Sequence, residues 1–291
     1  MFINLNIKKK FIKITSFVLC FLFITLSSVF LLNKNNSKNV NADEAISLPI
    51  LMYHGILENK KYQGEFVISP ENFESDLLYL KDNGYKTVVI SDLINYVYND
   101  AELPEKPIML TFDDGYYNNY VYAYPLLKKY DCKMVLSPIA KCSDEYSEIP
   151  DNNPNYAHVT WDNINEMISS GFVEIQNHSY NLHSCSGRLG AKKKSGESSS
   201  QYEKLLVNDV TKAQNRIYEK TQTTPQAFTY PFGAFCKESC SILKDMGFKC
   251  TLICEGKTNI ITKDPECLYN LGRYIRPGKI TTKQYFSEKN F

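Results

Sequence analysis

From residue 48 onward, hydrophobic and polar positions alternate in a pattern that predicts short strands separated by helices. The apolar runs that predict strands lie at 48–53, 86–90, 107–112, 133–137, 172–176, 227–230 and 249–253. Helical patterns separate them at 70–82, 91–98, 118–130, 160–170, 201–221 and 238–246. This order is typical of βαβ units, which build a parallel sheet with both faces covered by helices. We therefore expect a single barrel-like α/β domain.

Two of the predicted helices carry clear boundary signals. Ser69 is a good N-cap residue, Pro70 suits the first helical turn, and Asn83-Gly84 suits the end of that helix. Thr160 is the N-cap residue of a second helix. By contrast, residues 184–201 are rich in Ser, Gly and Lys, and we expect them to form a long polar loop.

The beginning of the chain has a different pattern, typical of export. Lys8, Lys9, Lys10 and Lys13 precede an uncharged, mostly apolar run at 14–32. We interpret residues 1–32 as a signal peptide or an uncleaved signal anchor, 33–47 as a polar tether, and 48–291 as the functional domain. The domain is then expected outside the cytoplasm, either anchored in the membrane or secreted to the cell surface.

The charge balance changes once this leader is set aside. The whole chain holds 33 basic and 32 acidic residues. Residues 1–42 contribute six lysines and no acid, so the remainder holds 27 basic against 32 acidic residues and is mildly acidic. Nucleic-acid binders usually show a strong basic excess. The composition therefore argues against nucleic acid as a partner.

Polar groups follow several predicted strands, at the ends where parallel α/β folds gather their active groups. Asp113 and Asp114 close the strand 107–112, and Gly115 then allows a sharp turn. Two carboxylates at the end of a buried strand are costly unless another group pairs with them. Their side chains point in different directions, so they can have different roles. A turn or helix cap is the alternative interpretation.

Two of the four histidines, His178 and His183, follow the predicted strand 172–176. At a spacing of five residues, neither a helix nor a strand would place both side chains on one face. Only a curled loop at the strand end can bring them to one point. Two ordinary loop histidines are the alternative interpretation.

Together these two clusters supply two imidazoles and two carboxylates. Two histidines and one carboxylate, with coordination positions left open, form a typical catalytic metal site. The second carboxylate can then accept a proton from water that the metal acidifies. A glycoside hydrolase that uses Asp113 and Asp114 is a competing hypothesis, but its carboxyl groups must lie about 5–9.5 Å apart across a bond. Sequence neighbours are poorly placed for that.

Two further elements follow predicted strands. In Tyr230-Pro231-Phe232-Gly233, the Pro and the Gly shape the backbone, which can direct an N–H at a developing oxyanion. His54 can reach the same rim and can protonate a leaving group near neutral pH. A simple turn and a structural histidine are the respective alternatives. His158 precedes the N-cap Thr160, and we expect it to be structural or peripheral.

These motifs, in this order, resemble those of the polysaccharide deacetylases, the NodB-homology carbohydrate esterases of family four. The residues that carry the resemblance are Thr111-Phe112-Asp113-Asp114-Gly115, then His178-Ser179 with His183, then Tyr230-Pro231-Phe232-Gly233. The resemblance covers about residues 48–280. It implies a distorted (β/α) barrel and a hydrolase that removes acetyl groups from a polysaccharide.

The resemblance also implies roles for individual residues. Asp113 resembles the catalytic base, and Asp114, His178 and His183 resemble the ligands of a divalent metal, usually Zn²⁺. Tyr230, Pro231 and Phe232 match the motif whose backbone helps to form the oxyanion hole.

The spacing of the two histidines and the early Met52-Tyr53-His54-Gly55 are similar to the branch that acts on poly-N-acetylglucosamine, in which the early histidine is the catalytic acid. The usual arginine before the third motif is missing. Arg273 and Arg276 are candidates to orient Asp113, and two surface arginines are the alternative interpretation. The expected substrate contains N-acetylglucosamine, and the membrane is a second partner if the leader stays uncleaved. Peptidoglycan, an O-acetylated sugar and an inactive glycan-binding wall module remain alternatives.

Overall fold

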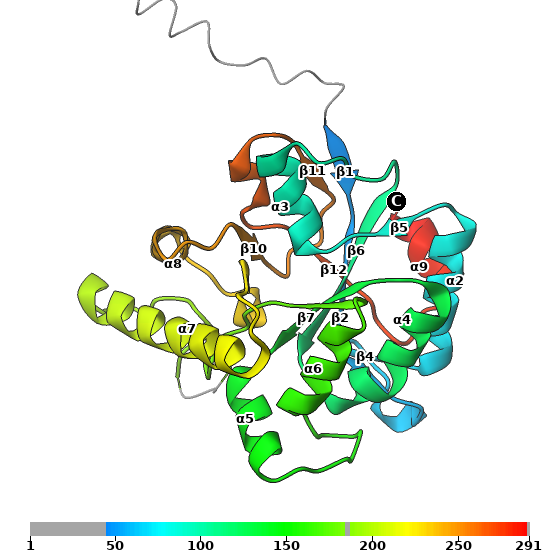
Figure 1. The fold of residues 1–291 in the computed structure, drawn as a ribbon, viewed down its shortest axis with the longest axis horizontal. Helices are drawn as coiled ribbons and strands as arrows, with labels where there is room; N and C mark the ends of the chain where they lie inside the picture. The colour runs from blue at the N-terminus through cyan, green and yellow to red at the C-terminus, as the bar shows by residue number, and fades with distance from the viewer. Residues whose placement is uncertain (1–44, 184–186, 290–291) are drawn as a thin grey trace, which may run out of the picture. The chain divides into compact units, whose positions relative to one another are not determined.

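The computed structural model describes residues 45–183 and 187–289 (Figure 1). Its centre is a parallel sheet in the order β12-β2-β6-β7-β8, with β5 also paired to β6. The bounds are β2 Ile50–Tyr53, β5 Lys86–Thr87, β6 Pro107–Asp114, β7 Met134–Pro138, β8 Val173–Ile175 and β12 Tyr274–Ile275. Every pairing within this sheet is parallel, as the alternating pattern predicts.

Two further strands close the sheet into a barrel. Strands β9 (Ala227–Thr229) and β10 (Cys250–Leu252) pair in parallel with each other. Single bridges join Asn177 to Phe228 on one side and Leu252 to Leu271 on the other. Hydrogen bonds accompany both junctions, since the Thr229 N–H donates to the Asn177 carbonyl and the Ile253 N–H donates to the Leu271 carbonyl, each over 2.9 Å. The expected distorted (β/α) barrel is therefore confirmed.

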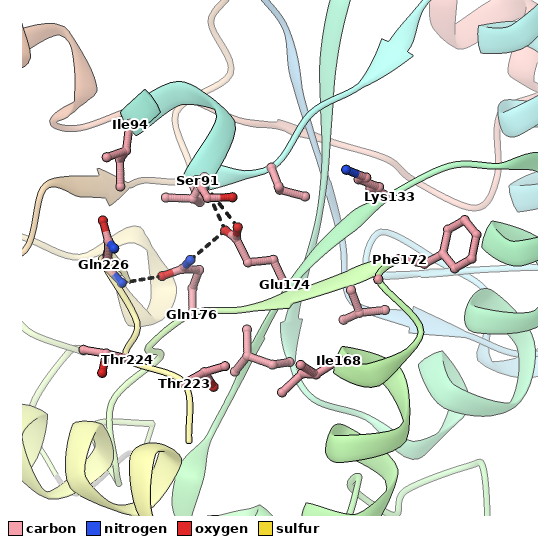
Figure 2. Close-up of a pocket in the computed structure, with 15 residues that line it drawn as sticks. Ser91, Ile94, Lys133, Ile168, Phe172, Glu174, Gln176, Thr223, Thr224 and Gln226 are labelled. Carbon is pink, nitrogen blue, oxygen red and sulfur yellow. Dashed lines mark hydrogen bonds between the residues drawn. The ribbon is translucent and has the colours of Figure 1, made fainter. Parts of the chain in front are cut away.

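The amino ends of β7, β8 and β9 surround a cavity of about 360 Å³, shown in Figure 2. The Gln176 side-chain oxygen accepts the N–H groups of Gln226 and Ala227, and its amide nitrogen donates to Glu174. The Glu174 carboxylate in turn accepts the N–H of Ser91, at the start of helix α3 (Ile90–Asn99). Between β8 and β9, these side-chain hydrogen bonds take the place of backbone pairing. The polar groups of this cavity therefore help to close the barrel.

Helices surround the strands in Figure 1. Their bounds are α2 Pro70–Asp82, α3 Ile90–Asn99, α4 Tyr124–Tyr130, α5 Ala140–Glu148, α6 Trp161–Ser169, α7 Ser199–Thr221, α8 Lys237–Asp245 and α9 Thr282–Lys289. Short helices lie at Lys60–Tyr62, Asn119–Ala123, Pro231–Gly233 and Pro265–Leu268. Among the described residues, no helix is long and apolar enough to cross a membrane.

Alternation along β6 decides which of its side chains face into the barrel. Leu110 and Phe112 pack with buried residues of the surrounding helices, whereas Met109 packs in a separate cluster with Ile50 and Val135. Side chains two residues apart share a face, so Met109, Thr111 and Asp113 line the inner side in succession. The strand therefore delivers Asp113 to the inside of the barrel at its carboxyl end.

Most predicted elements form, and the differences lie at their ends. The α2 boundaries are confirmed, with the Ser69 hydroxyl accepting the Asn72 N–H. The predicted strand 86–90 is shorter, because α3 already begins at Ile90. Ser198 caps α7, so the loop expected to reach 201 ends before Ser199.

The sequence patterns missed several elements. Helix α5 was not expected, because its sequence is mostly polar and no side chain caps its start. The pair β1 (Ile46–Leu48) and β11 (Asn259–Ile261) was also missed, so Ile46 and Ser47 belong to the sheet structure rather than to the tether. The predicted leader at 1–32 lies outside the described residues.

Candidate active site and metal centre

The Asp113 carboxylate is held by Arg273 inside the barrel. The guanidinium donates to both carboxylate oxygens, over 2.7 and 2.8 Å, and neither side chain is more than 3% exposed. Arg273 itself is fixed by the Ile253 carbonyl at 3.0 Å and the Thr111 hydroxyl at 3.2 Å. Burial alone would raise the pKa of Asp113, but the Arg273 guanidinium, together with His178 and His54, more than offsets this and lowers it. Asp113 is thus a rigid, ionised acceptor.

Arg276 does not share this task. It pairs instead with Asp76 on α2, over 2.8 and 3.0 Å, in a second fully buried ion pair. The Thr282 and Tyr53 hydroxyls complete the hydrogen bonding of Asp76. The expectation that Arg276 orients Asp113 is therefore wrong, because residues three apart along an extended segment point to opposite sides. Arg276 joins β12 to α2 and α9.

Asp114 leaves the strand in a left-handed conformation, with φ of 68°, followed by Gly115 at 74°. A side chain at Gly115 would come within 2.7 Å of Pro138, so glycine is required there. This sharp turn directs Asp114 away from Asp113 and towards the two histidines. Its Oδ1 lies 3.4 Å from Nε2 of His178 and 3.4 Å from Nε2 of His183.

These three side chains converge as a metal site would require. The two Nε2 atoms lie 2.8 Å apart, and one ligand atom from each residue lies within 4.8 Å of the others. Asp114 Oδ1 is buried and has no well-formed hydrogen bond from a described residue. His178 Nδ1 lies 2.7 Å from the Thr229 carbonyl, which fixes the proton there and leaves Nε2 free to coordinate. Burial and the neighbouring His178 lower the pKa of His183 to about 4, which keeps its ring neutral. Burial also acts to lower the pKa of His178, but the carboxylates of Asp114 and Asp113 outweigh it and raise that pKa. The set fits a divalent cation.

The loop between the two histidines is curled, as their spacing predicts. Ser179 takes φ of 70°, and its hydroxyl accepts the N–H of Leu182. The Asn177 side chain accepts the Ser179 N–H at the start of the turn. These bonds reverse the chain between His178 and His183 and bring both imidazoles to Asp114.

His54 directly follows β2 and lies beside Asp113. Its Nε2 is 4.0 Å from Asp113 Oδ2, and its ring packs edge-on against Phe66. Burial lowers the pKa of His54 despite the nearby carboxylates of Asp113 and Asp114. The structure therefore brings His54 to the same centre as the other predicted residues. His158 lies at the periphery, with Nδ1 3.0 Å from the Asp114 carbonyl.

The third motif lies on the far rim. Tyr230 is fully buried, and its hydroxyl donates to the Cys240 sulfur. Phe232 adopts φ of 58°, is 45% exposed, and its ring packs 4.5 Å from that of His183. Pro231 has no N–H, whereas the Phe232 N–H has no acceptor among the described residues. Of Tyr230, Pro231 and Phe232, only Phe232 therefore has a backbone N–H without an acceptor among the described residues.

One cavity of about 710 Å³ is lined by six of the predicted site residues: His54, Asp113, Asp114, His178, His183 and Phe232. Its walls carry Tyr62, Phe66, Tyr116 and Phe232. From their positions in the sequence, Tyr116, Tyr117, Trp161 and Tyr180 are candidates to stack on sugar rings, and of these four only Tyr116 lines the cavity. Trp161 is buried with its indole N–H on Asp144, and the Tyr180 hydroxyl also points to Asp144. Tyr62 and Phe66, 47% and 50% exposed, were missed because the short segment that holds them shows neither helical nor strand periodicity.

Comparisons with known proteins show the family to which this chain belongs. The family model described as Polysaccharide deacetylase matches residues 100–251. Poly-β-1,6-N-acetyl-D-glucosamine N-deacetylase of Escherichia coli (strain K12) is 23% identical over 217 residues, which cover 68% of this chain and 32% of that protein. A relative from Bacillus subtilis (strain 168) is 27% identical over 210 residues, which cover 72% of this chain and 65% of that relative. The chain thus spans less than two thirds of the length of these relatives.

Solved structures show the same fold. A de-N-acetylase from Aggregatibacter actinomycetemcomitans superposes with a TM-score of 0.69 at 28% identity, covering 83% of this chain and all of the other. IcaB from Ammonifex degensii gives a TM-score of 0.66 at 24% identity, covering 84% and 96%. Because the family model matches more than half of the chain, the protein belongs to the polysaccharide deacetylase family and is a hydrolase of that family.

Proposed function

We propose that this enzyme removes N-acetyl groups from N-acetylglucosamine units of an extracellular or cell-wall polysaccharide. The observation that carries this proposal is the convergence of Asp114, His178 and His183 beside the Asp113–Arg273 pair, in one open cavity. A carboxylate next to a three-residue metal site suits hydrolysis of an amide by water.

Asp114, His178 and His183 would hold the divalent ion, for which two imidazoles and a carboxylate favour zinc. When bound, such an ion supplies Lewis-acid chemistry that polarises water and the acetyl carbonyl. The His178 ring is already oriented by the Thr229 carbonyl, so little reorganisation is needed for binding.

Asp113 and His54 would each carry out one of the two proton transfers of amide hydrolysis. Asp113 accepts a proton from water as the new carbon–oxygen bond forms. His54 Nε2, 4.0 Å from Asp113 Oδ2, lies where it can hand a proton to the departing nitrogen as the carbon–nitrogen bond breaks. The products are acetate and a free amine. The Phe232 N–H is the proposed donor to the negative oxygen that develops between these steps.

The charge of the residues that line the cavity favours a neutral glycan as the substrate. No lysine or arginine lines its described part, whereas Glu65, Asp113 and Asp114 do. An uncharged amide sugar would enter such a cavity more easily than a chain that bears carboxylates at the cleaved unit. The exposed rings of Tyr62, Phe66 and Phe232 offer apolar faces to sugar rings. The Escherichia coli relative is named for the N-deacetylation of poly-β-1,6-N-acetyl-D-glucosamine, which is the polymer we propose.

Release of acetate tests the proposal directly. The enzyme should release acetate from oligomers of β-1,6-linked N-acetylglucosamine, and a chelator should stop the reaction until Zn²⁺ is returned. Peptidoglycan and acetylated xylan serve as competing substrates under the same conditions. Preference for either would assign the alternative substrate, and binding without acetate release would indicate a glycan-binding module. The predicted leader would place this activity outside the cytoplasm.

A further inference from the structure

The second half of the histidine loop is held by a helix rather than by the barrel. The first half pairs with β9, since the Asn177 N–H donates to the Ala227 carbonyl and the Thr229 N–H donates to the Asn177 carbonyl. Beyond Ser179 the chain leaves that strand. The position of His183 therefore depends on contacts other than strand pairing.

On one side of the turn, these contacts come from a single carboxylate on α7. Asp209 Oδ1 accepts the N–H of Tyr180 over 2.8 Å, and Oδ2 accepts the N–H of Asn181 over 3.0 Å. Two consecutive amides thus point at the two oxygens of one side chain, a geometry that fixes both distance and rotation of the peptide. The residues involved lie between the two proposed metal ligands.

Helix α5 holds the opposite side of the same turn. The N–H groups of Ala140 and Lys141, at the start of α5, donate to the carbonyls of Ser179 and Tyr180. Free N–H groups at a helix start are natural donors to such carbonyls. The turn is thus clamped between donors on α5 and an acceptor on α7, and Asp209 supplies the acceptor.

We propose that Asp209 is a positioning residue that sets His183 relative to Asp114 and His178, and so determines the affinity of the metal centre. This inference rests on the proposed metal-dependent function. Asp209→Asn keeps the size of the side chain but replaces one acceptor oxygen by a donor, so one of the two loop amides loses its partner. Partners that orient metal ligands typically contribute about 10- to 100-fold to metal affinity.

The test is a titration of Zn²⁺ alone into the chelator-stripped chain, with Kd measured for wild type and Asp209→Asn. Ile217→Val, in the buried face of the same α7, is the control for loss of stability, and Glu203→Gln, exposed on α7, is the control for loss of charge. We expect Asp209→Asn to raise Kd at least tenfold and both controls to leave it unchanged. At saturating Zn²⁺ the KM for the glycan should match wild type.

A second measurement separates positioning from misfolding. Amide hydrogen exchange of the stripped protein should become faster at Tyr180 or Asn181 in Asp209→Asn, at whichever amide loses its acceptor, while α7 stays protected. If Asp209→Asn and Ile217→Val have similar melting temperatures and the same Kd for Zn²⁺, Asp209 has only a structural role and the inference is wrong. If wild type itself does not bind Zn²⁺, the proposed metal centre fails, and this inference fails with it.

Discussion

Replacement of Arg273 by Met tests whether this buried arginine is what keeps Asp113 charged and in place. Met has a similar length and no charge, so the Asp113 carboxylate would remain inside the barrel without its partner. Removing one member of a buried ion pair typically costs about 3–5 kcal/mol. Arg273 also donates to the Ile253 carbonyl and the Thr111 hydroxyl, and both would lose this donor, although the Thr111 hydroxyl keeps its bond to the Leu51 carbonyl. We therefore expect a loss of about 4 kcal/mol in the free energy of unfolding.

The matched control is Arg276→Met, which breaks the other fully buried pair, with Asp76. Both variants should lose stability to a similar extent, which for a domain of this size lowers the melting temperature by about 8–16 °C. Urea unfolding of chelator-treated protein measures the free energies. Acetate release per folded molecule separates the variants, because a displaced base costs about 100-fold in rate, whereas Arg276 touches none of the proposed catalytic groups.

A double-mutant cycle decides the physical cause. With Asp113→Asn already present, Arg273→Met should cost about 2 kcal/mol less than it does in wild type, since no buried charge is left unpaired. An Arg273→Met variant that loses less than about 1 kcal/mol, or a cycle with no coupling, would refute the pairing as the origin of the stabilisation.

The remaining predictions concern the proposed active site. Asp113→Asn should lower acetate release by about 10²- to 10⁴-fold with Zn²⁺ binding intact, whereas His178→Ala should lose both; near-normal turnover in Asp113→Asn would make the base assignment wrong. His54→Ala should fail on the glycan amide yet still hydrolyse p-nitrophenyl acetate, whose leaving group needs no proton; equal losses on both substrates would contradict an acid role. Phe66→Ala should raise KM for oligomers more than for the monosaccharide, and equal effects would exclude a stacking role beyond the reacting unit.

The convergence of the site could be predicted from chain order. Parallel strands bring their carboxyl ends to the same side of a barrel, so Asp113, His178 and Phe232 had to meet there once the strands were recognised. The divergence of Asp113 from Asp114 was also expected, because neighbours on a strand point to opposite faces. The left-handed turn at Asp114 carries that divergence further and directs its carboxylate to the histidines.

The arginine partner could be predicted only in part. Arg273 and Arg276 flank β12, a strand of two residues that is too short to show an alternating pattern. The sequence therefore offered both arginines as partners of Asp113. Strand geometry allows only one of them to face inward, and the register of β12 on β2 selects Arg273.

No pattern in the sequence indicates that Tyr62 and Phe66 line the cavity or that Asp209 holds the histidine loop. Phe66 lies in an irregular segment, and nothing in its neighbours distinguishes it from an ordinary surface residue. Asp209 follows the loop by nearly thirty residues and is one of several acids on a long amphipathic helix. Only the packing of α7 against the barrel reveals that its carboxylate faces two loop amides.

The two halves of the site are held by different kinds of structure, and this separates their mutational effects. Asp113 lies on a central strand and is fixed by a buried guanidinium, so changes there alter the base and the stability of the barrel together. His183 lies on a loop fixed by α5 and α7, outside the strand ladder. Its position can therefore be weakened without loss of the barrel. Loss of the Asp209 carboxylate on α7 should consequently reduce metal affinity while the proton-transfer groups keep their geometry.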